Sequence, residues 1–121
     1  MFLQLNHQKL DIYETSRVFV VECYKLSNKI PVEEKYGMQS QLRRAALSVH
    51  LNIAEGASRK SLSERKRYYE IARGSLVEVD AALDIAQNLG YLNEINLSAL
   101  EYLMIKCFKI LSGLIKSTIH H

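Results

Sequence analysis

Apolar residues recur every three or four positions along most of the chain, and no stretch shows the strict alternation of a half-buried strand. This period predicts four amphipathic helices, at about residues 7–30, 38–55, 61–89 and 93–117. Pro31 is expected to end the first helix, because proline has no amide hydrogen for the last turn. Four helices with short connectors predict an all-α fold, an antiparallel up-down-up-down four-helix bundle that spans residues 1–121 as a single domain.

Residues that favour helix ends support these boundaries. Gly56 follows the second helix and Gly90 the third, and each is expected to cap its helix in the left-handed conformation. Residues 61–64 read Ser-Leu-Ser-Glu, the spacing of a capping box, which places the start of the third helix. Asn93 or Asn96 is expected to begin the fourth helix.

The second helix carries two apolar arcs. The core arc consists of Met38, Leu42, Ala45, Ala46, Val49 and Ile53. Leu47, Leu51 and Ala54 form a second arc nearly opposite to it. A surface helix of a monomeric bundle needs only one such arc, so the second one predicts self-association.

A polar stripe lies between these two arcs. It consists of Gln41, Arg44, Ser48, Asn52 and Glu55. Arg44 and Glu55 are about three turns apart, too far to pair within one helix, and each can reach its opposite on a neighbouring copy. We therefore expect the stripe and the second apolar arc to form the oligomer interface. The alternative is that both charged side chains are solvated.

The third helix contains Gly74 near its middle. A glycine inside a helix destabilises it by about 1 kcal/mol relative to alanine. Gly74 is therefore expected where a side chain would clash with a neighbour.

The composition argues against a disordered protein, a turn-rich β-fold and a membrane protein. The chain has 121 residues, 48% hydrophobic residues, a formal net charge of +3, five glycines and one proline. These values are atypical of disordered chains and of turn-rich β-folds. The chain has no apolar run of membrane-spanning length and no signal-peptide core, so we expect a soluble cytoplasmic protein without a membrane partner. Cys23 and Cys107 lie in apolar stripes and are expected in the core as free thiols.

The charge is concentrated in the middle of the chain. Residues 37–73 carry eight basic and three acidic side chains, which suggests an anionic partner. The candidate nucleic-acid-binding residues are Arg59, Lys60, Arg65, Lys66, Arg67 and Arg73, around the start of the third helix. Tyr69 is expected at the edge of this basic face, better placed than the inward-facing Tyr68 to stack on a base, although core packing is the favoured role for both.

Several segments resemble one known family. The stretch at residues 30–49, which includes QLRRAA at 41–46, is followed by NIAEG at 52–56 and by IARGSLVE at 71–78. These segments resemble the four-helix-bundle proteins encoded by intervening sequences inside bacterial 23S rRNA genes. The resemblance implies a ring-like homopentamer and kinship with the accessory variability proteins, which partner a reverse transcriptase in diversity-generating retroelements and contact nucleic acid. The family has no established enzymatic activity, so we expect no enzyme.

The chain departs from that family at His50, where many relatives have a proline. The substitution predicts a straighter second helix and places His50 on the same arc as Arg43. Arg43 or Arg44 followed by His50 also resembles the Arg-x4–6-His signature of the HEPN ribonucleases, in which His acts as general base and Arg stabilises the phosphorane charge. This spacing is loose enough to occur by chance.

Other motifs of catalysis and of cofactor or metal binding are missing from the sequence. We therefore expect no catalytic residues, no cofactor and no metal, and His120 and His121 at the terminus would make a poor metal site. The favoured hypothesis is a non-enzymatic homo-oligomer that binds RNA or DNA without sequence preference. The alternatives are a scaffold that recruits a protein such as a reverse transcriptase and, more remotely, a HEPN-like ribonuclease.

Overall fold

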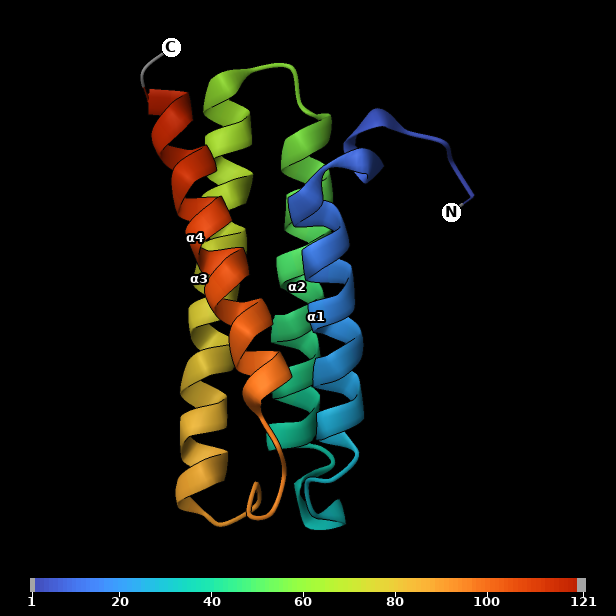
Figure 1. Ribbon diagram of the computed structural model, residues 1–121, viewed down its shortest axis with the longest axis vertical. Helices are drawn as coiled ribbons and strands as arrows, with labels where there is room; N and C mark the ends of the chain where they lie inside the picture. The colour runs from blue at the N-terminus through green and yellow to red at the C-terminus, as the bar shows by residue number, and fades with distance from the viewer. Residues whose placement is uncertain (1, 120–121) are drawn as a thin grey trace.

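Four long helices make up the protein, as a computed structural model that describes residues 2–119 shows. They are α1 (Asp11–Ser27), α2 (Met38–Ser58), α3 (Leu62–Asn88) and α4 (Ser98–Ile119), with 3₁₀ turns η1 (Asn6–Lys9) and η2 (Val32–Glu34). The helices run alternately down and up along one axis (Figure 1). The described part of the chain holds no strand, which confirms the all-α bundle. The predicted role of the terminal histidine pair, His120 and His121, lies outside the described residues.

The first helix is shorter than predicted at both ends. It begins at Asp11, because Leu10 is extended (φ −69°, ψ 140°) and separates it from η1. It ends at Ser27, and the next residues form turns in which the amides of Lys29 and Ile30 donate to carbonyls three residues back. The ring of Pro31 disfavours helical backbone at the residue before it, so the helix stops ahead of the proline.

Gly56 does not cap the second helix, so that prediction is wrong. The second helix continues to Ser58, and Gly56 is buried within it. A Cβ atom at Gly56 would lie 2.9 Å from Cε1 of Tyr69 and 3.1 Å from Cβ of Tyr68. The glycine is therefore required by the close approach of α3 and not by a left-handed conformation. Gly90, with φ 81°, does adopt the left-handed conformation predicted after α3.

The starts of α3 and α4 are fixed by side-chain caps. Oγ of Ser61 accepts a hydrogen bond from the amide of Glu64 at 3.4 Å, which confirms the predicted start of α3. Oδ1 of Asn96 accepts from the amide of Ser98 at 3.0 Å and from its hydroxyl at 2.7 Å. The fourth helix therefore begins two residues after Asn96, one of its two predicted starts.

The core lies on the axis of the bundle. Its largest fully buried side chains include Phe19, Leu42, Val49, Ile53, Val79 and Leu111. The core arc predicted for α2 is buried except for the half-buried Met38. Cys23 and Cys107 are buried free thiols, and burial raises the pKa of each to about 12. None of the helices within residues 2–119 has the length and apolarity of a membrane-spanning segment.

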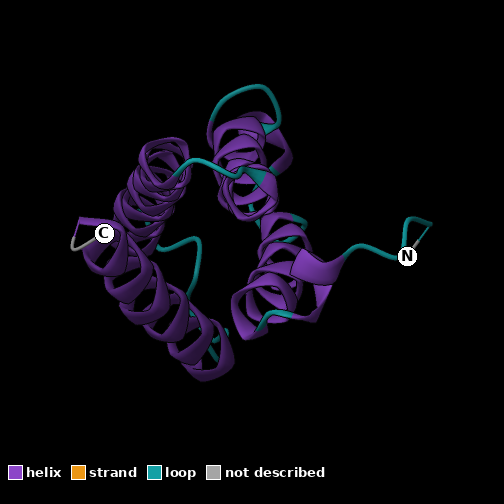
Figure 2. Ribbon diagram, turned by 90° about the horizontal axis from the view of Figure 1, so that it is seen from above, coloured by secondary structure: helices purple, strands orange, loops and turns teal. Residues whose placement is uncertain are grey.

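Each helix packs against two neighbours, so α2 and α4 lie across the diagonal from one another, as do α1 and α3 (Figure 2). A polar contact also joins each pair of neighbouring helices; we call the contact region between two such helices a seam. Between α2 and α3, the hydroxyls of Ser48 and Ser75 are 2.8 Å apart. Between α1 and α4, Nζ of Lys106 donates to Oδ1 of Asp11 at 3.3 Å.

Gly74 differs from Gly56, and its predicted steric role is wrong. It is exposed on α3, and a Cβ atom there would meet no atom within 4 Å among the described residues. Nothing within the subunit therefore requires a glycine at this position.

We predict opposite effects for alanine at these two helical glycines. Gly74→Ala should raise the free energy of unfolding by about 1 kcal/mol, because it removes backbone entropy from the unfolded chain without a clash. Gly56→Ala should lower it by about 1–3 kcal/mol, because the buried ring of Tyr69 must move. Urea unfolding at one protein concentration measures both. Equal effects of the two substitutions would contradict the close α2–α3 contact at Gly56.

Candidate functional site

The candidate nucleic-acid surface lies at the end of the bundle where α2 passes into α3, at the top of Figure 1. Five of the six predicted cations lie in the connector or in the first turns of α3: Arg59, Lys60, Arg65, Lys66 and Arg67. The sixth, Arg73, is about 18 Å along α3 from Ser61. Its Nη1 donates to Oγ of Ser112 at 3.2 Å, and its guanidinium lies 5.9 Å from the ring of Phe108. Arg73 therefore belongs to the α3–α4 seam and not to this surface.

Arg59 is held by contacts within the protein. Its Nη2 donates to Oε2 of Glu55 at 2.8 Å and to the hydroxyl oxygen of Tyr68 at 3.2 Å. Its guanidinium also lies 5.0 Å from the centre of the Tyr68 ring. The Tyr68 hydroxyl and the Glu55 carboxylate both raise the pKa of Arg59. The charge of Arg59 is thus largely compensated by Glu55.

Arg65 also has a structural role, because its Nε donates to the carbonyl oxygen of Arg59 at 2.5 Å. This bond ties the first turn of α3 back to the connector. Lys60, Lys66 and Arg67 differ from Arg59 and Arg65, since their side chains make no hydrogen bond or ion pair with another described residue. Lys60 and Arg67 are exposed and Lys66 is half-buried. We call these three residues the free cations.

The free cations surround the amino-terminal turn of a 27-residue helix. Backbone amides in a first turn have no partner within the helix, and the helix dipole adds partial positive charge there. Glu64 lies in this turn and opposes the cations, but its carboxylate is exposed. The arrangement can accept the phosphates of a polyanion.

The predicted roles of the two tyrosines are reversed. Tyr69 is only 5% exposed, packs against Gly56, and has its pKa raised by burial. Tyr68 is half-buried, with Arg59 against its ring and hydroxyl. The space left by the missing side chain at Gly56 receives the ring of Tyr69 and turns it into the core. Tyr69 therefore cannot stack on a base, and Tyr68 already has a cation on its ring.

The predicted oligomer interface on α2 divides into two parts. Gln41 and Ser48 contact α3 within the subunit: Nε2 of Gln41 donates to Oε2 of Glu78 at 3.1 Å, and the hydroxyls of Ser48 and Ser75 are 2.8 Å apart. Asn52 is bonded within α2, where its Nδ2 donates to the carbonyl oxygen of Ser48 at 2.8 Å. The remainder of the predicted interface consists of Arg44, Leu47, Leu51, Ala54 and Glu55.

Four of these residues form an open surface, since Glu55 pairs with Arg59. The outer α2 face, as we define it, consists of Arg44, Leu47, Leu51 and Ala54. Leu51 is 52% exposed, Leu47 and Arg44 are exposed, and Ala54 is half-buried. The side chain of Arg44 makes no hydrogen bond or ion pair with another described residue.

His50 contacts α1. Its Nδ1 lies 2.7 Å from Oγ of Ser16, and its ring centre is 4.6 Å from that of Tyr13. Oγ of Ser16 also lies 3.1 Å from the carbonyl oxygen of Tyr13; when the hydroxyl donates to that oxygen, Nδ1 of His50 donates to Ser16. Burial, followed by the charge of Arg17, lowers the pKa of His50, while Glu14 acts in the opposite direction.

Arg43 also contacts α1, but with different partners. Its Nε donates to Oγ of Ser27 and its Nη2 to Oδ1 of Asn28, both at 2.6 Å, and its guanidinium lies 5.1 Å from the ring of Tyr24. Arg43 and His50 are separated by about 10 Å along α2. These contacts account for both side chains as parts of the α1–α2 seam.

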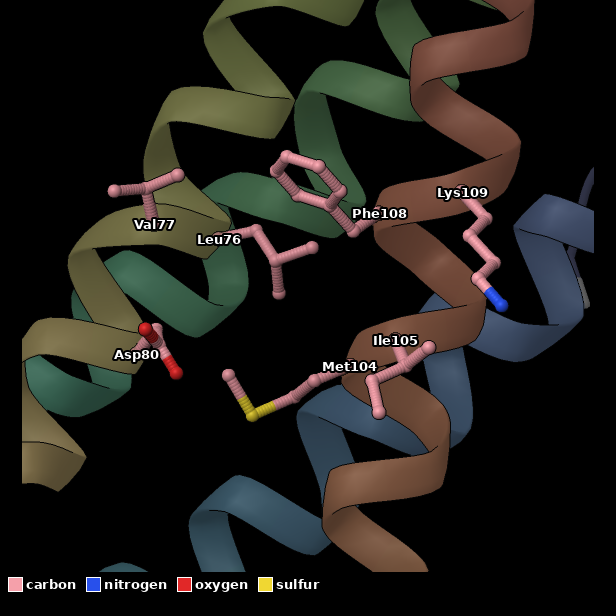
Figure 3. A pocket seen from close by; sticks show the side chains of 7 residues that line it. All are labelled: Leu76, Val77, Asp80, Met104, Ile105, Phe108 and Lys109. Atoms are coloured by element: carbon pink, nitrogen blue, oxygen red, sulfur yellow. The ribbon is translucent and has the colours of Figure 1, made fainter.

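A hollow between α3 and α4 was not found from the sequence. It has a volume of about 280 Å³ and is lined by Leu76, Val77, Asp80, Met104, Ile105, Phe108 and Lys109 (Figure 3). The signal for it is that Ile105 and Phe108 extend the apolar surface of α4 beyond its buried stripe, which indicates a second covered face. Within residues 2–119, no group of three or more His, Cys, Asp or Glu side chains lies close enough together to hold a metal ion.

The model of the 23S rRNA-intervening sequence protein family matches residues 8–113. The chain therefore belongs to this family. A search of curated proteins gives no match.

We predict that His50 makes the protein less stable in acid. The unfolded chain binds a proton at His50 near its ordinary pKa of 6.5, whereas the folded protein resists protonation to lower pH. Its stabilising contribution is thus complete above pH 6.5 and is lost as the pH falls through the lowered pKa. His50→Gln should remove this part of the pH dependence. Urea unfolding between pH 8 and pH 5 measures it, and equal pH slopes in both proteins would contradict the prediction.

Proposed function

We propose that this member of the 23S rRNA-intervening sequence protein family is a non-enzymatic homo-oligomer that binds RNA or DNA without sequence preference. The observation that carries the proposal is the set of free cations at the start of α3, Lys60, Lys66 and Arg67. Neighbouring arginines have partners within the protein, but the charges of these three are available to a ligand.

Contacts made by such a surface go mainly to phosphates. Lysine and arginine side chains beside a helix start bind phosphate oxygens and do not read base edges, so the binding is independent of sequence and weakens with salt. The positions of Tyr68 and Tyr69 support a backbone-only mode, since Tyr69 is buried and Arg59 covers one face of the half-buried Tyr68 ring.

Self-association raises the affinity for nucleic acid above that of a single subunit. The exposed leucines of the outer α2 face favour an oligomer, and family membership favours a ring-like homopentamer. A ring repeats the free cations once per subunit, so contacts with one long polyanion add through effective concentration.

A second function, a scaffold that recruits a protein such as a nucleic-acid polymerase, is favoured by the amino-terminal segment. Residues 2–5 project away from the bundle beside the start of α1 (Figure 1). Phe2 is 105% exposed, and Leu3 and Leu5 are also exposed. An exposed apolar segment of this kind fits a protein partner better than it fits a nucleic acid.

We predict that Lys60→Ala/Arg67→Ala weakens binding to RNA and DNA. Each phosphate contact contributes about 0.9 to the slope of log affinity against log salt on duplex DNA, so the slope should become shallower by about 2 for each subunit that contacts the nucleic acid. Lys29→Ala/Lys35→Ala is the control, since it removes the same charge at the far end of the bundle. Fluorescence anisotropy with two unrelated sequences between about 50 and 200 mM salt measures the slopes. Equal losses in both double variants would contradict a site at the start of α3.

We predict that Leu51→Glu dissociates the oligomer into monomers. The substitution buries an unpaired carboxylate between subunits, which is unfavourable by several kcal/mol. Light scattering after size exclusion reports the mass. Val32→Glu, at an exposed position in η2, is the matched control and should leave the oligomer intact. A wild-type mass equal to the 13.9 kDa of one chain would contradict self-association itself.

A further inference from the structure

The hollow between α3 and α4 is an apolar surface that the subunit leaves open. Val77 from α3 is 53% exposed and Ile105 from α4 is 48% exposed. Figure 3 shows Leu76, Met104 and Phe108 directed into the space between the two helices, with Asp80 at its edge. Large exposed apolar side chains grouped around a hollow are typical of a surface that another molecule covers.

We propose that this hollow receives the outer α2 face of a second copy of the chain. The inference rests on the self-association proposed above and names the surface that completes the contact. It makes the interface heterologous: each subunit contributes its α2 face to one neighbour and its α3–α4 hollow to another.

The placement of the two surfaces supports a head-to-tail arrangement. The hollow lies on the α3–α4 side of the bundle, and α2 does not contact α4 (Figure 2). The outer α2 face points away from the core at a different corner. Surfaces that point in different directions cannot both be buried in one two-fold contact, whereas they generate a ring when the rotation closes.

The two surfaces also match in height along the bundle. The Ser48–Ser75 hydrogen bond of 2.8 Å sets α2 and α3 level with each other. Arg44 lies four residues before Ser48, and Asp80 lies five residues after Ser75 on the antiparallel helix. Both are therefore about 6–8 Å from that bond in the same direction. In the proposed ring we place the axis along the bundle, which keeps equivalent heights, so Arg44 of one copy lies level with Asp80 of the next.

The apolar residues follow the same register. Leu47 lies one residue before Ser48, and Val77 lies two residues after Ser75, so they differ by only about 1.5 Å in height. Val77 and Phe108 line the hollow together. Leu47 is thus level with the apolar part of the hollow, and Leu51 lies one turn further along α2.

One pair of opposite charges also matches across the proposed contact; Lys109 is the other charged residue that lines the hollow. Arg44 and Asp80 are both exposed, and neither side chain makes a hydrogen bond or ion pair with another described residue. Seating the outer α2 face in the hollow gives each of them its opposite charge at the edge of an apolar contact, where an ion pair is partly shielded from water.

The first test exchanges these two charges. Arg44→Glu and Asp80→Arg should each weaken self-association by about a hundredfold or more, and the double variant should recover most of it. Glu33→Arg, an exposed acidic position in η2, is the control and should have no effect. Light scattering over a concentration series measures the affinity. Oligomers unaffected by Asp80→Arg would overturn the proposed pairing.

The second test mixes two variants that each lack one surface. Leu51→Glu destroys the α2 face and Val77→Glu the hollow, so each should be monomeric alone, with circular dichroism confirming that both fold. Their mixture retains one intact interface and should form a complex of about twice the 13.9 kDa of one chain. If Val77→Glu remains oligomeric while Leu51→Glu dissociates, the α2 faces contact another surface and the hollow is excluded. A monomeric wild type would instead contradict the proposed function.

Discussion

The close contact between Gly56 of α2 and Tyr69 of α3 determines how the second and third helices meet. Because Gly56 has no side chain, the Tyr69 ring occupies that space and α3 lies directly against the end of α2. The connector between them is then short, and Arg59 and Arg65 fold back over it through Glu55, Tyr68 and the Arg59 carbonyl. The free cations, Lys60, Lys66 and Arg67, lie on the outer side of this connector and make no such contacts within the described part of the chain.

Most of the fold follows from the periodicity of the sequence, and the exceptions have local physical causes. The core arc of α2, the Ser61 cap and the Gly90 turn are properties of a few neighbouring residues, so a sequence pattern is sufficient to predict them. The cap prediction for Gly56 is wrong because a glycine near a helix end serves equally as a left-handed cap or as a point of close contact. Only the position of α3 distinguishes the two roles, and that position is not a local property.

In the candidate site, too, features set by neighbouring residues were predictable and features set by distant parts of the chain were not. The sequence located the basic cluster, but it could not separate Arg59 and Arg65 from Lys60 and Arg67, since the difference lies in acceptors contributed by other parts of the chain. The assignment of Tyr68 and Tyr69 is wrong for a different reason, because Tyr69 lies three residues before Ala72 and seven before Leu76 and so shares the buried stripe that the helical period itself indicates. The hollow beside α4 had a weak sequence signal, an excess of apolar residues with no assigned partner.

The two buried cysteines give the bundle a chemical property of its own. Burial raises the pKa of Cys23 and Cys107 to about 12, so both are thiols at neutral pH, and neither residue is exposed to solvent. Oxidants and alkylating reagents attack thiolates, so they must wait until α1 and α4 separate. The rate of thiol modification therefore measures how often the core opens, and an assembly that holds the helices together would slow it.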